Sequence, residues 1–282
     1  MRTRREHHPT SKHALLLTGG AFLALSLLAL SRKGNSIYAD RPEEQNPFEG
    51  KHVVFAEDAD EPENADGLRG HLEEVGAAEP YHSFYQDVIK RGLDIGASFA
   101  GIVLLAPLMG AIALVIKAED SGPILFTQKR VGQNKRFFRM HKFRTMKMSA
   151  PHDTPTHMLQ DPDQHLTRTG RFLREFSLDE LPQIWDVFLG NMSVAGPRPA
   201  LWNQDVLVAE RDRYGANAVR PGLTGWAQIN GRDELSISEK AAYDGAYTDR
   251  VKKGGLKALL FDLRCVALTG IYVICRKWGK EK

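Results

Sequence analysis

The feature that most constrains this chain is an uncharged run of 22 residues, Ile95–Ile116, with a proline near its centre. As a helix with a rise of about 1.5 Å per residue, the run would extend about 33 Å, enough to cross the hydrocarbon core of a bilayer. Pro107 would remove one backbone hydrogen bond from that helix and bend or break it. Two structures are therefore open: a bent, re-entrant hairpin, and a straight span that tolerates the proline.

Charge divides the 282-residue chain into three parts. Residues 1–39 carry a net charge of +5 and contain Ala14–Leu30, an uncharged run with basic residues on both sides. This run predicts a short uncleaved membrane anchor, although the same pattern also describes a secretory signal. Residues 40–80 carry a net charge of −10 and few aromatic residues, which predicts a disordered, acidic linker. Residues 81–282 would form one membrane-associated domain that includes a re-entrant helix at 89–117.

Beyond the apolar run, the residue pattern predicts a mixed α/β (α+β) fold that is mostly helical. Residues 123–147 alternate apolar and polar side chains around Gly132-Gln133-Asn134, which predicts a β-hairpin. Helical periodicity follows at 171–187 and 200–214, and residues 226–230 would form a short strand. The final run, 256–275, predicts either an amphipathic helix in the membrane interface or an ordinary buried terminal helix.

The only two cysteines, Cys265 and Cys275, lie ten residues apart in that final run. A helix would separate them by about 15 Å, which is beyond the reach of a disulfide. Their apolar setting also lacks the cations that activate a catalytic thiol. Both are therefore predicted to be reduced cysteines with a structural role.

A strongly basic segment without any carboxylate, residues 129–147, follows the apolar run Ile95–Ile116. Strand alternation would place Lys142 and Arg144 on one face and Arg139 on the other. At least one face could therefore bind phosphate groups, either of lipid headgroups or of a charged substrate. A solvated basic surface is the alternative. The cations of this segment are Lys129, Arg130, Lys135, Arg136, Arg139, Lys142, Arg144 and Lys147.

Carboxylates and guanidinium groups come together around residue 179. Arg168, Arg171 and Arg174 precede the sequence Ser177-Leu178-Asp179-Glu180-Leu181-Pro182. Two structural interpretations are open: a capping box from Ser177 to Glu180, and a later helix start with Asp179 as the N-cap. The functional interpretation is that Asp179, at a helix N-terminus beside arginines, stays ionised and attacks phosphorus as a nucleophile. Glu180 could then bind Mg²⁺ together with substrate phosphate oxygens.

Two further arginines lie beside prolines. Arg198 stands between Pro197 and Pro199, and Arg220 precedes Pro221. A rigid backbone suits an arginine that binds phosphate with two nitrogens, whereas a solvated corner of the surface is the alternative for both.

Taken together, these segments resemble the bacterial sugar transferase family, the monotopic phosphoglycosyl transferases. The resemblance covers about Tyr85–Lys277 in order, leaves out residues 1–80, and is specific as a set. Its segments are Lys90-Arg91 with Asp94, the apolar run broken at Pro107, Phe126–Gly132, Lys142–Met146, Ser177–Gln183, Gly196–Pro199 and Arg220–Trp226.

Members of this family move a sugar 1-phosphate from a UDP-sugar donor to undecaprenyl phosphate at the cytosolic face of the bacterial inner membrane, which begins a surface glycan. For this chain the resemblance implies that Asp179 is the nucleophile, that a phosphosugar–aspartyl intermediate forms with release of UMP, and that Glu180 binds Mg²⁺. Ping-pong kinetics would follow. The residues implied to hold phosphates are Arg174, Arg198, Arg220, Lys142 and Arg144. Such roles agree with the need of phosphoryl transfer for charge neutralisation.

The partners implied by the resemblance are the UDP-sugar, the lipid acceptor and the membrane, without nucleic acid, and self-association into a homo-oligomer is left open. A competing interpretation is a membrane-tethered module that binds anionic lipid or another polyanion through residues 129–147 without catalysis. Such a module would bind polyanions with an affinity that falls as salt rises and would show no turnover, which would distinguish it from an enzyme.

The chain departs from the family pattern at one position and carries one conflict of sidedness. Family members commonly place serine before the breaking proline, whereas this chain has Ala106, so the bend would depend on Pro107 alone. If residues 14–30 span the membrane with their basic start inside, the linker lies outside, away from cytosolic nucleotide sugars. We therefore expect this N-terminal run either to insert in the opposite direction or not to span.

Overall fold

The computed structural model of the chain describes residues 44–64, 66–78, 81–150, 162–231 and 234–279, so the predicted anchor at 14–30 lies outside the described residues. The fold is mixed α/β, as predicted. Its strands are β1 (Lys51–Ala56), β2 (His71–Ala77), β3 (Leu125–Val131), β4 (Phe137–Phe143), β5 (Ser193–Ala195) and β6 (Gly222–Thr224). Its helices are α2 (Arg91–Glu119), α3 (Arg168–Glu175), α4 (Gln183–Leu189), α5 (Asp205–Arg213), α6 (Trp226–Ile229), α7 (Ile237–Lys253) and α8 (Gly255–Gly279).

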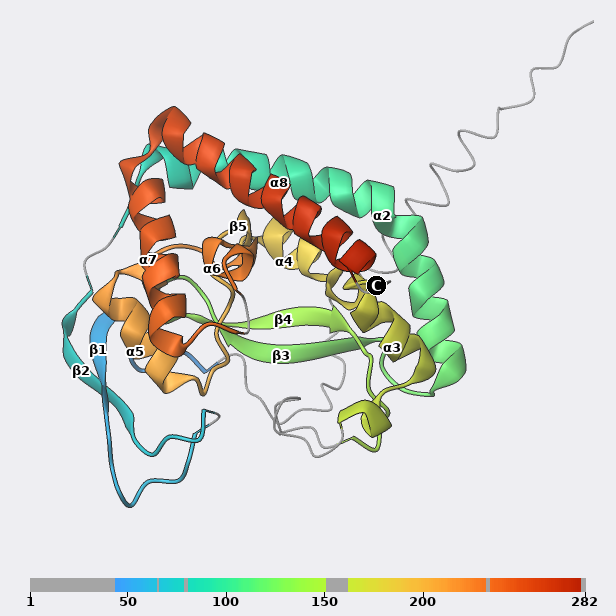
Figure 1. Cartoon of the computed structure of the whole chain (residues 1–282), viewed down its shortest axis with the longest axis horizontal. Coiled ribbons are helices and arrows are strands. Elements are labelled where there is room, and N and C mark those ends of the chain that lie inside the picture. Colours follow the sequence, from blue (N-terminus) through green and yellow to red (C-terminus); the bar gives the residue numbers. More distant parts are fainter. Residues whose placement is uncertain (1–43, 65, 79–80, 151–161, 232–233, 280–282) are drawn as a thin grey trace, which may run out of the picture.

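The β3–β4 hairpin lies in the middle of the molecule and confirms the prediction for residues 123–147 (Figure 1). Its strands pair antiparallel from Leu125 opposite Phe143 to Val131 opposite Phe137. Directly opposed residues share a face and side chains alternate along each strand, so Arg130 of β3 lies on the same face as Lys142 of β4. This face is the one that reaches the carboxylates described below.

The long apolar run forms one continuous helix. The π-helical turn η1 (Tyr85–Lys90) leads directly into α2, and Tyr85–Glu119 is the one helix among the described residues that is long and apolar enough to cross a membrane. Pro107 lies inside α2, and Figure 1 shows this helix bending from the top of the molecule down one side. Many large apolar side chains on α2 are exposed, which fits contact with lipid. They are Leu93, Ile95, Phe99, Val103, Leu104, Leu108, Leu114 and Val115.

Three polar residues at the start of this helix fasten it to the rest of the domain. The Nζ atom of Lys90 donates to the carboxylate of Asp262 in α8 at 2.8 Å. The guanidinium of Arg91 donates to two carbonyl oxygens near the end of α4, both at 2.7 Å. The carboxylate of Asp94 accepts a hydrogen bond from the backbone of Val194 in β5 at 2.9 Å. The Lys-Arg and Asp of the first motif therefore orient the start of the apolar helix on α8, α4 and β5.

Part of the acidic segment is folded, so the prediction of a disordered linker is wrong for residues 51–56 and 71–77. β1 and β2 form an antiparallel hairpin, and its Val53 and Leu72 are buried in one cluster with Leu207 and Val208 of α5. Composition averaged over the whole segment hides the local alternation that gives these strands an apolar face. The apolar surface of α5 supplies the burial that the segment cannot provide by itself.

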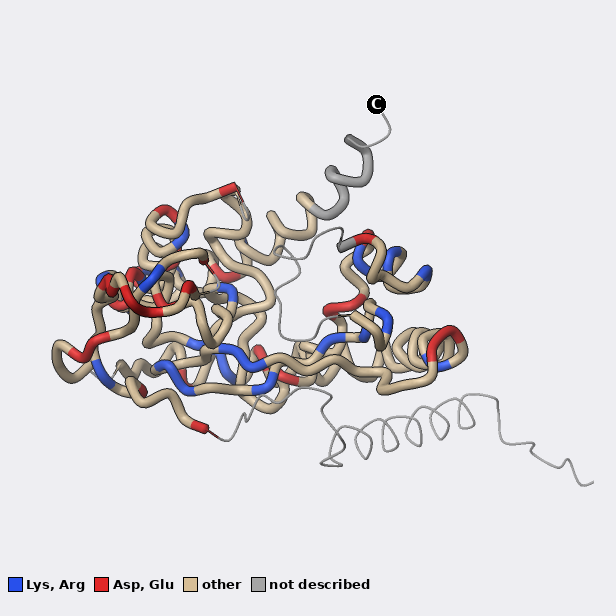
Figure 2. Tube along the Cα trace, turned by 90° about the horizontal axis from the view of Figure 1, so that it is seen from below, with Lys and Arg blue, Asp and Glu red and all other residues tan. Residues whose placement is uncertain are grey.

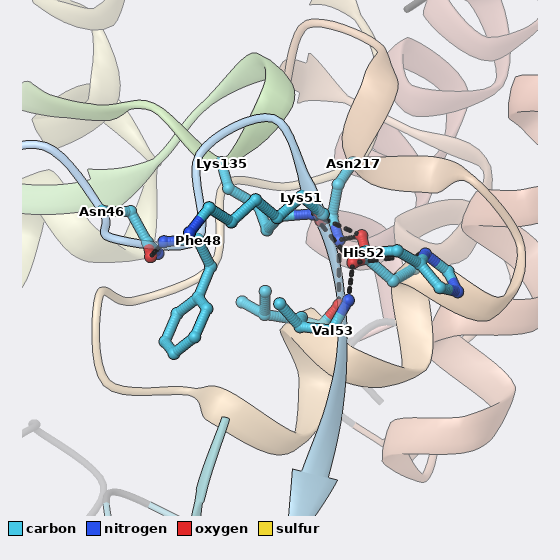
Figure 3. A network of polar contacts seen from close by, with 9 residues as sticks. Asn46, Phe48, Lys51, His52, Val53, Lys135 and Asn217 are labelled. Carbon is cyan, nitrogen blue, oxygen red and sulfur yellow. Dashed lines mark hydrogen bonds and ion pairs between the residues drawn. The ribbon is translucent and has the colours of Figure 1, made fainter. Parts of the chain in front are cut away.

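A buried ion pair attaches this hairpin to the domain (Figure 3). The Nζ atom of Lys135, in the turn between β3 and β4, donates to the two carboxylate oxygens of Asp212 at 2.9 and 2.8 Å and also to the carbonyl oxygen of Lys51. The same carboxylate accepts from the amide of Asn217 at 2.6 Å and from the backbone of Val53 at 2.8 Å. Both charges are compensated, which is the condition for a buried ion pair to be tolerated.

Two short parallel strands, β5 and β6, bring the two proline-containing motifs together, with Ser193 paired to Gly222. A Cβ atom on Gly222 would lie 2.1 Å from the backbone nitrogen of Gly196, and a Cβ atom on Gly225 would lie 2.2 Å from the carbonyl oxygen of Gly196. No side chain fits at such separations. The glycines of these motifs are therefore required by the close approach of two backbones.

The C-terminal half differs from the sequence prediction in three places. The helix predicted at 171–187 is divided into α3 and α4 by the turn at 178–180. Residues 226–229 form the short helix α6, so the predicted strand at 226–230 is wrong, and the strand β6 lies just before it. Helix α7 was not predicted at all. It begins with a capping box in which the Ser236 hydroxyl accepts from the backbone of Glu239 and the Glu239 carboxylate accepts from the backbone of Ser236. The S-x-x-E spacing at 236–239 was the available signal.

Helix α8 confirms the predicted terminal helix, and its two sides differ in burial. One side is packed in the core, where burial raises the pKa of the Cys265 thiol to about 12, in agreement with a structural cysteine. The other side exposes Leu256, Leu260, Leu263 and Val266. Residues 265–272 carry no charged side chain, and the part of α8 that Figure 2 draws in colour ends in a tan stretch without blue or red. The side chain of Cys275 lies outside the described residues.

Candidate active site

Asp179 and Glu180 lie in a single turn of 3₁₀ helix, η5 (Leu178–Glu180), between α3 and α4. Ser177 begins this turn in the left-handed conformation with φ 54°, which is uncommon for a residue other than glycine. Its side chain caps nothing, and α4 begins only at Gln183, after Pro182. Neither structural alternative for this motif is therefore observed: Ser177 forms no capping box, and Asp179 is not the N-cap of α4.

Glu180 is held by two cations that come from different parts of the chain. Its Oε1 atom accepts from the Nζ atom of Lys142 in β4 at 2.8 Å and from Nη2 of Arg198, in the segment after β5, at 2.9 Å. Burial by itself would raise the pKa of Glu180, but the charges and hydrogen bonds of Arg198 and Lys142 outweigh burial and hold that pKa far below its usual range. Glu180 is therefore ionised at neutral pH. The structure brings together three of the predicted site residues here.

Asp179 has a different electrostatic environment from its neighbour. Burial raises the pKa of Asp179 and the negative charge of Glu180 raises it further, while Lys142 and Arg174 act in the opposite direction. The pKa thus moves opposite to the direction expected from a helix N-terminus beside arginines, because desolvation exceeds the attraction. Two adjacent carboxylates with pKa values shifted in opposite directions are typical of sites where they have separate chemical roles.

Arg174 belongs to the same site. Its Nε atom donates to the hydroxyl of Thr145 at 2.9 Å, which orients the guanidinium. Burial lowers the pKa of Arg174, and the charge of Asp179 partly opposes that shift. Arg168 and Arg171, which precede it in α3, are exposed to solvent.

Arg130 also belongs to the site, although the sequence analysis identified it only as one of the eight cations of residues 129–147. Its guanidinium donates to the carbonyl oxygen of Pro199 at 3.0 Å and to the side chain of Gln128 at 2.7 Å. Burial and the charge of Arg198 lower the pKa of Arg130 to about 9, although Glu180 acts in the opposite direction. Its buried Nε atom has no hydrogen-bond partner among the described residues. The strand alternation of the hairpin, which places Arg130 and Lys142 on one face, was the signal that could have identified it.

Two of the predicted phosphate-binding residues have other neighbours. The guanidinium of Arg144 donates to the carboxylate of Asp120 at 3.2 Å and to its carbonyl oxygen at 2.6 Å, which ties the end of α2 to the segment after β4. Arg220 lies just before β6, and its carbonyl oxygen would lie 2.4 Å from a Cβ atom on Gly196, so its backbone is part of the close approach of the two motifs. Neither residue takes part in the contacts around Glu180.

A buried contact between Asp186 and His141 joins α4 to β4 next to the turn that carries the two carboxylates. Asp186 of α4 is fully buried, and its carboxylate accepts from the backbone of His141 in β4 at 2.9 Å and lies 2.8 Å from the Nδ1 atom of the same histidine. Since His141 precedes Lys142, this contact sets the position of Lys142 relative to the turn that carries Glu180.

Few side chains at this turn could bind a metal ion. No group of three or more His, Cys, Asp and Glu side chains able to hold a metal ion occurs in the described part of the chain. Mg²⁺ commonly uses one or two carboxylates and completes its coordination with substrate phosphates and water. Asp179 and Glu180 meet that smaller requirement, because one oxygen of Glu180 is left over from its ion pairs with Lys142 and Arg198.

The model of one protein family, described as bacterial sugar transferase, matches residues 85–276. The chain belongs to the bacterial sugar transferase family. The match begins at the turn η1 that leads into α2 and ends within α8, so every contact described around Glu180 lies inside it.

Several proteins are similar to part of this sugar transferase. It is 44% identical to the UDP-N-acetylgalactosamine-undecaprenyl-phosphate N-acetylgalactosaminephosphotransferase of Aeromonas hydrophila, over 50% of this chain and 34% of the relative. It is 39% identical to the UDP-glucose:undecaprenyl-phosphate glucose-1-phosphate transferase of Xanthomonas campestris pv. campestris, over 61% of this chain and 36% of the relative. The chain thus spans about a third of the length of these two proteins. It is also 34% identical to the uncharacterized sugar transferase EpsL of Bacillus subtilis (strain 168), over 64% of this chain and 85% of the relative.

Proposed function

We propose that this protein transfers a sugar 1-phosphate from a UDP-sugar to undecaprenyl phosphate at the cytosolic face of the bacterial inner membrane. The observation that carries the proposal is the pair Asp179 and Glu180 among Lys142, Arg174 and Arg198, on a domain fastened to an apolar helix. The names of the Aeromonas and Xanthomonas relatives each specify a UDP-sugar and undecaprenyl phosphate, which supports the choice of donor and acceptor.

The two carboxylates suit different roles. Glu180 is ionised and bound by two cations, so its oxygens are poor nucleophiles. Asp179 makes no ion pair within the described residues, and its raised pKa makes its oxygen the more basic and the more nucleophilic of the two. We therefore assign Asp179 as the nucleophile and Glu180 as the residue that positions the surrounding cations and Mg²⁺.

The reaction would proceed in two displacements at phosphorus. A carboxylate oxygen of Asp179 forms a bond to the phosphorus next to the sugar while the bond from that phosphorus to the bridging oxygen breaks, and UMP leaves with the electron pair. A phosphate oxygen of undecaprenyl phosphate then attacks the same phosphorus, and Asp179 leaves as a carboxylate. The guanidinium of Arg174, held by Thr145, would face the negative charge that develops on the phosphoryl oxygens.

Mg²⁺ would be held by the oxygen of Glu180 that Lys142 and Arg198 do not use, with Asp179 beside it. When bound, the ion would neutralise part of the diphosphate charge of the donor. Lys142 and Arg198 keep Glu180 ionised, which is the state that binds a hard cation.

The test is release of UMP by the purified full chain with Mg²⁺ and a panel of UDP-sugars, with and without undecaprenyl phosphate. We expect one donor to release UMP, and Asp179→Asn to abolish that release while Asp249→Asn, an exposed aspartate on α7, leaves it unchanged. With donor alone, mass spectrometry should find the sugar phosphate on the peptide that contains Asp179. Inactivity with every donor, or a label on another residue, would contradict the proposal. Salt-dependent polyanion binding without turnover would favour the non-catalytic module instead.

We also propose that α2 is re-entrant, with both ends at the cytosolic face and the bend provided by Pro107, since Ala106 offers no hydroxyl to a freed carbonyl. Single cysteines at the exposed positions Gly92 and Ala118, in a chain with both native cysteines replaced by alanine, should react with an impermeant maleimide from the cytosolic side only. Labelling of Gly92→Cys and Ala118→Cys from opposite sides would identify a straight span.

A further inference from the structure

A second cluster of cations, separate from the residues around Glu180, surrounds a cavity where α7 meets α8. The cavity has a volume of about 660 Å³, and none of its lining residues is acidic. Four like charges so close together repel one another unless an anion lies between them. The residues that matter are Arg250 and Lys253 of α7, Lys257 and Arg264 of α8, and the apolar side chains of Leu260 and Phe261.

The arginines of this cavity are oriented by aromatic rings and not by carboxylates. The guanidinium of Arg250 lies 4.3 Å from the centre of the Phe261 ring, and that of Arg264 lies 5.3 Å from the centre of the Trp226 ring. A guanidinium stacked on a ring keeps its N–H groups available at its edge. Their charges are thus unneutralised by ion pairs within the described part of the chain.

The nearest carboxylate in α8, Asp262, cannot serve as the counterion. It accepts from the Nζ atom of Lys90 at 2.8 Å and from the hydroxyls of Tyr85 and Tyr247, both at 2.7 Å, and it is buried by these contacts. Asp262 therefore faces the core while the basic side chains of α7 and α8 face the cavity.

These same contacts place the cavity where the membrane helix begins. Lys90 and Tyr85 belong to the turn η1 that leads into α2, and a Cβ atom on Gly254, which lines the cavity, would lie 3.6 Å from the Cβ atom of Tyr85. Leu256 and Leu260 of α8 are 69% and 56% exposed beside the cations. Basic and large apolar side chains on one helix are the composition of a segment that lies in the headgroup region of a bilayer.

We propose that this cavity binds the headgroup of an anionic phospholipid, with the phosphate among Arg250, Lys253, Lys257 and Arg264 and the acyl chains along the exposed leucines of α8. The charge complementarity, the apolar rim and the position at the start of α2 all select a lipid phosphate over a soluble one. Such a lipid would hold α7 and α8 against the membrane. Binding of this lipid involves no turnover, so it can be measured whether or not the protein catalyses the transfer reaction.

The test is native mass spectrometry of the detergent-solubilised full chain titrated with dihexanoyl phosphatidylglycerol. The double variant Lys253→Gln/Lys257→Gln should bind this lipid about thirtyfold more weakly, the factor that corresponds to about 1 kcal/mol for each cation lost at an anionic surface. The matched control Lys51→Gln/Arg136→Gln removes the same charge from exposed side chains elsewhere and should change the affinity by less than about twofold.

Three further titrations distinguish the sources of phosphate. Dihexanoyl phosphatidylcholine and inorganic phosphate should each bind more weakly than the phosphatidylglycerol, because the first lacks net charge and the second lacks acyl chains. Undecaprenyl phosphate should bind with no dependence on Lys253 and Lys257. Equal binding of the phosphatidylcholine, an equal loss in the control variant, an unchanged affinity in the pocket variant, or loss of undecaprenyl phosphate binding in that variant would each overturn the proposal.

Discussion

Replacing Lys142 by methionine tests the electrostatic account of the site most directly. Methionine keeps most of the apolar stem and removes the charge that donates to Glu180 at 2.8 Å. A hydrogen bond to a charged group contributes about 1.5 to 3 kcal/mol. Arg198 still pairs with Glu180 in the variant, at 2.9 Å, so no unpaired carboxylate is left behind. We therefore expect the lower part of that range, a decrease in kcat/KM for UMP release of about tenfold to thirtyfold.

The same substitution should change the pH dependence, and its sign follows from the pKa shifts. Lys142 lowers the pKa of Asp179, so its removal lets burial raise that pKa further. An aspartate nucleophile must be ionised to attack. The acidic limb of the profile of kcat/KM against pH should therefore move to higher pH in Lys142→Met, and rate should be recovered in part at alkaline pH.

The assay is UMP release under single-donor conditions across a range of pH, with two controls. Lys142→Arg keeps the positive charge and should retain the acidic limb near its original position. Lys147→Met removes an exposed cation whose Nζ atom donates to the carbonyl oxygen of Gln164, and should leave the profile unchanged. An unshifted limb in Lys142→Met, or an equal shift in Lys147→Met, would refute this account of Asp179.

Three other results are expected. Lys135→Met leaves the buried carboxylate of Asp212 uncompensated, so it should lower the free energy of unfolding by about 3 kcal/mol in urea titrations. Gly222→Ala should destabilise the protein and lower activity in parallel, because its Cβ atom would overlap the backbone of Gly196, and the urea midpoint measures this. The folded-state pKa of Glu180 is depressed, so its ionised form stabilises the protein above the unfolded-state value of about 4.3 and this contribution is lost as pH falls further. The difference in urea midpoint between the protein and Glu180→Gln should therefore shrink from pH 6 to about pH 3.

The local patterns of the sequence predicted most of the elements. The alternation around Gly132 gave the β3–β4 hairpin, and the uncharged run gave α2, because both signals depend on the chemistry of neighbouring residues. The helix α7 was missed although its capping box is a local signal at Ser236 and Glu239. The hairpin of β1 and β2 could not be predicted in this way, because Val53 and Leu72 are stabilised by α5, which follows more than a hundred residues later.

In the candidate site too, some features follow from local sequence patterns and others depend on contacts between distant residues. The carboxylates Asp179 and Glu180 and the cations Lys142, Arg174 and Arg198 are recognisable from the sequence because their residue types and motifs are distinctive. Their partners are not recognisable in this way. Strand alternation predicted that Arg144 would share a face with Lys142. In the structure Arg144 follows the end of β4 and pairs with Asp120.

The sequence by itself determined which groups are available: an apolar helix with a proline, two adjacent carboxylates and an excess of cations. Only the tertiary structure decided which cation meets which carboxylate, that burial raises the pKa of Asp179 while Lys142 and Arg198 lower that of Glu180, and that Arg130 lies beside them. The physical reason is that desolvation and Coulomb interactions depend on distances in space, which local sequence patterns do not encode.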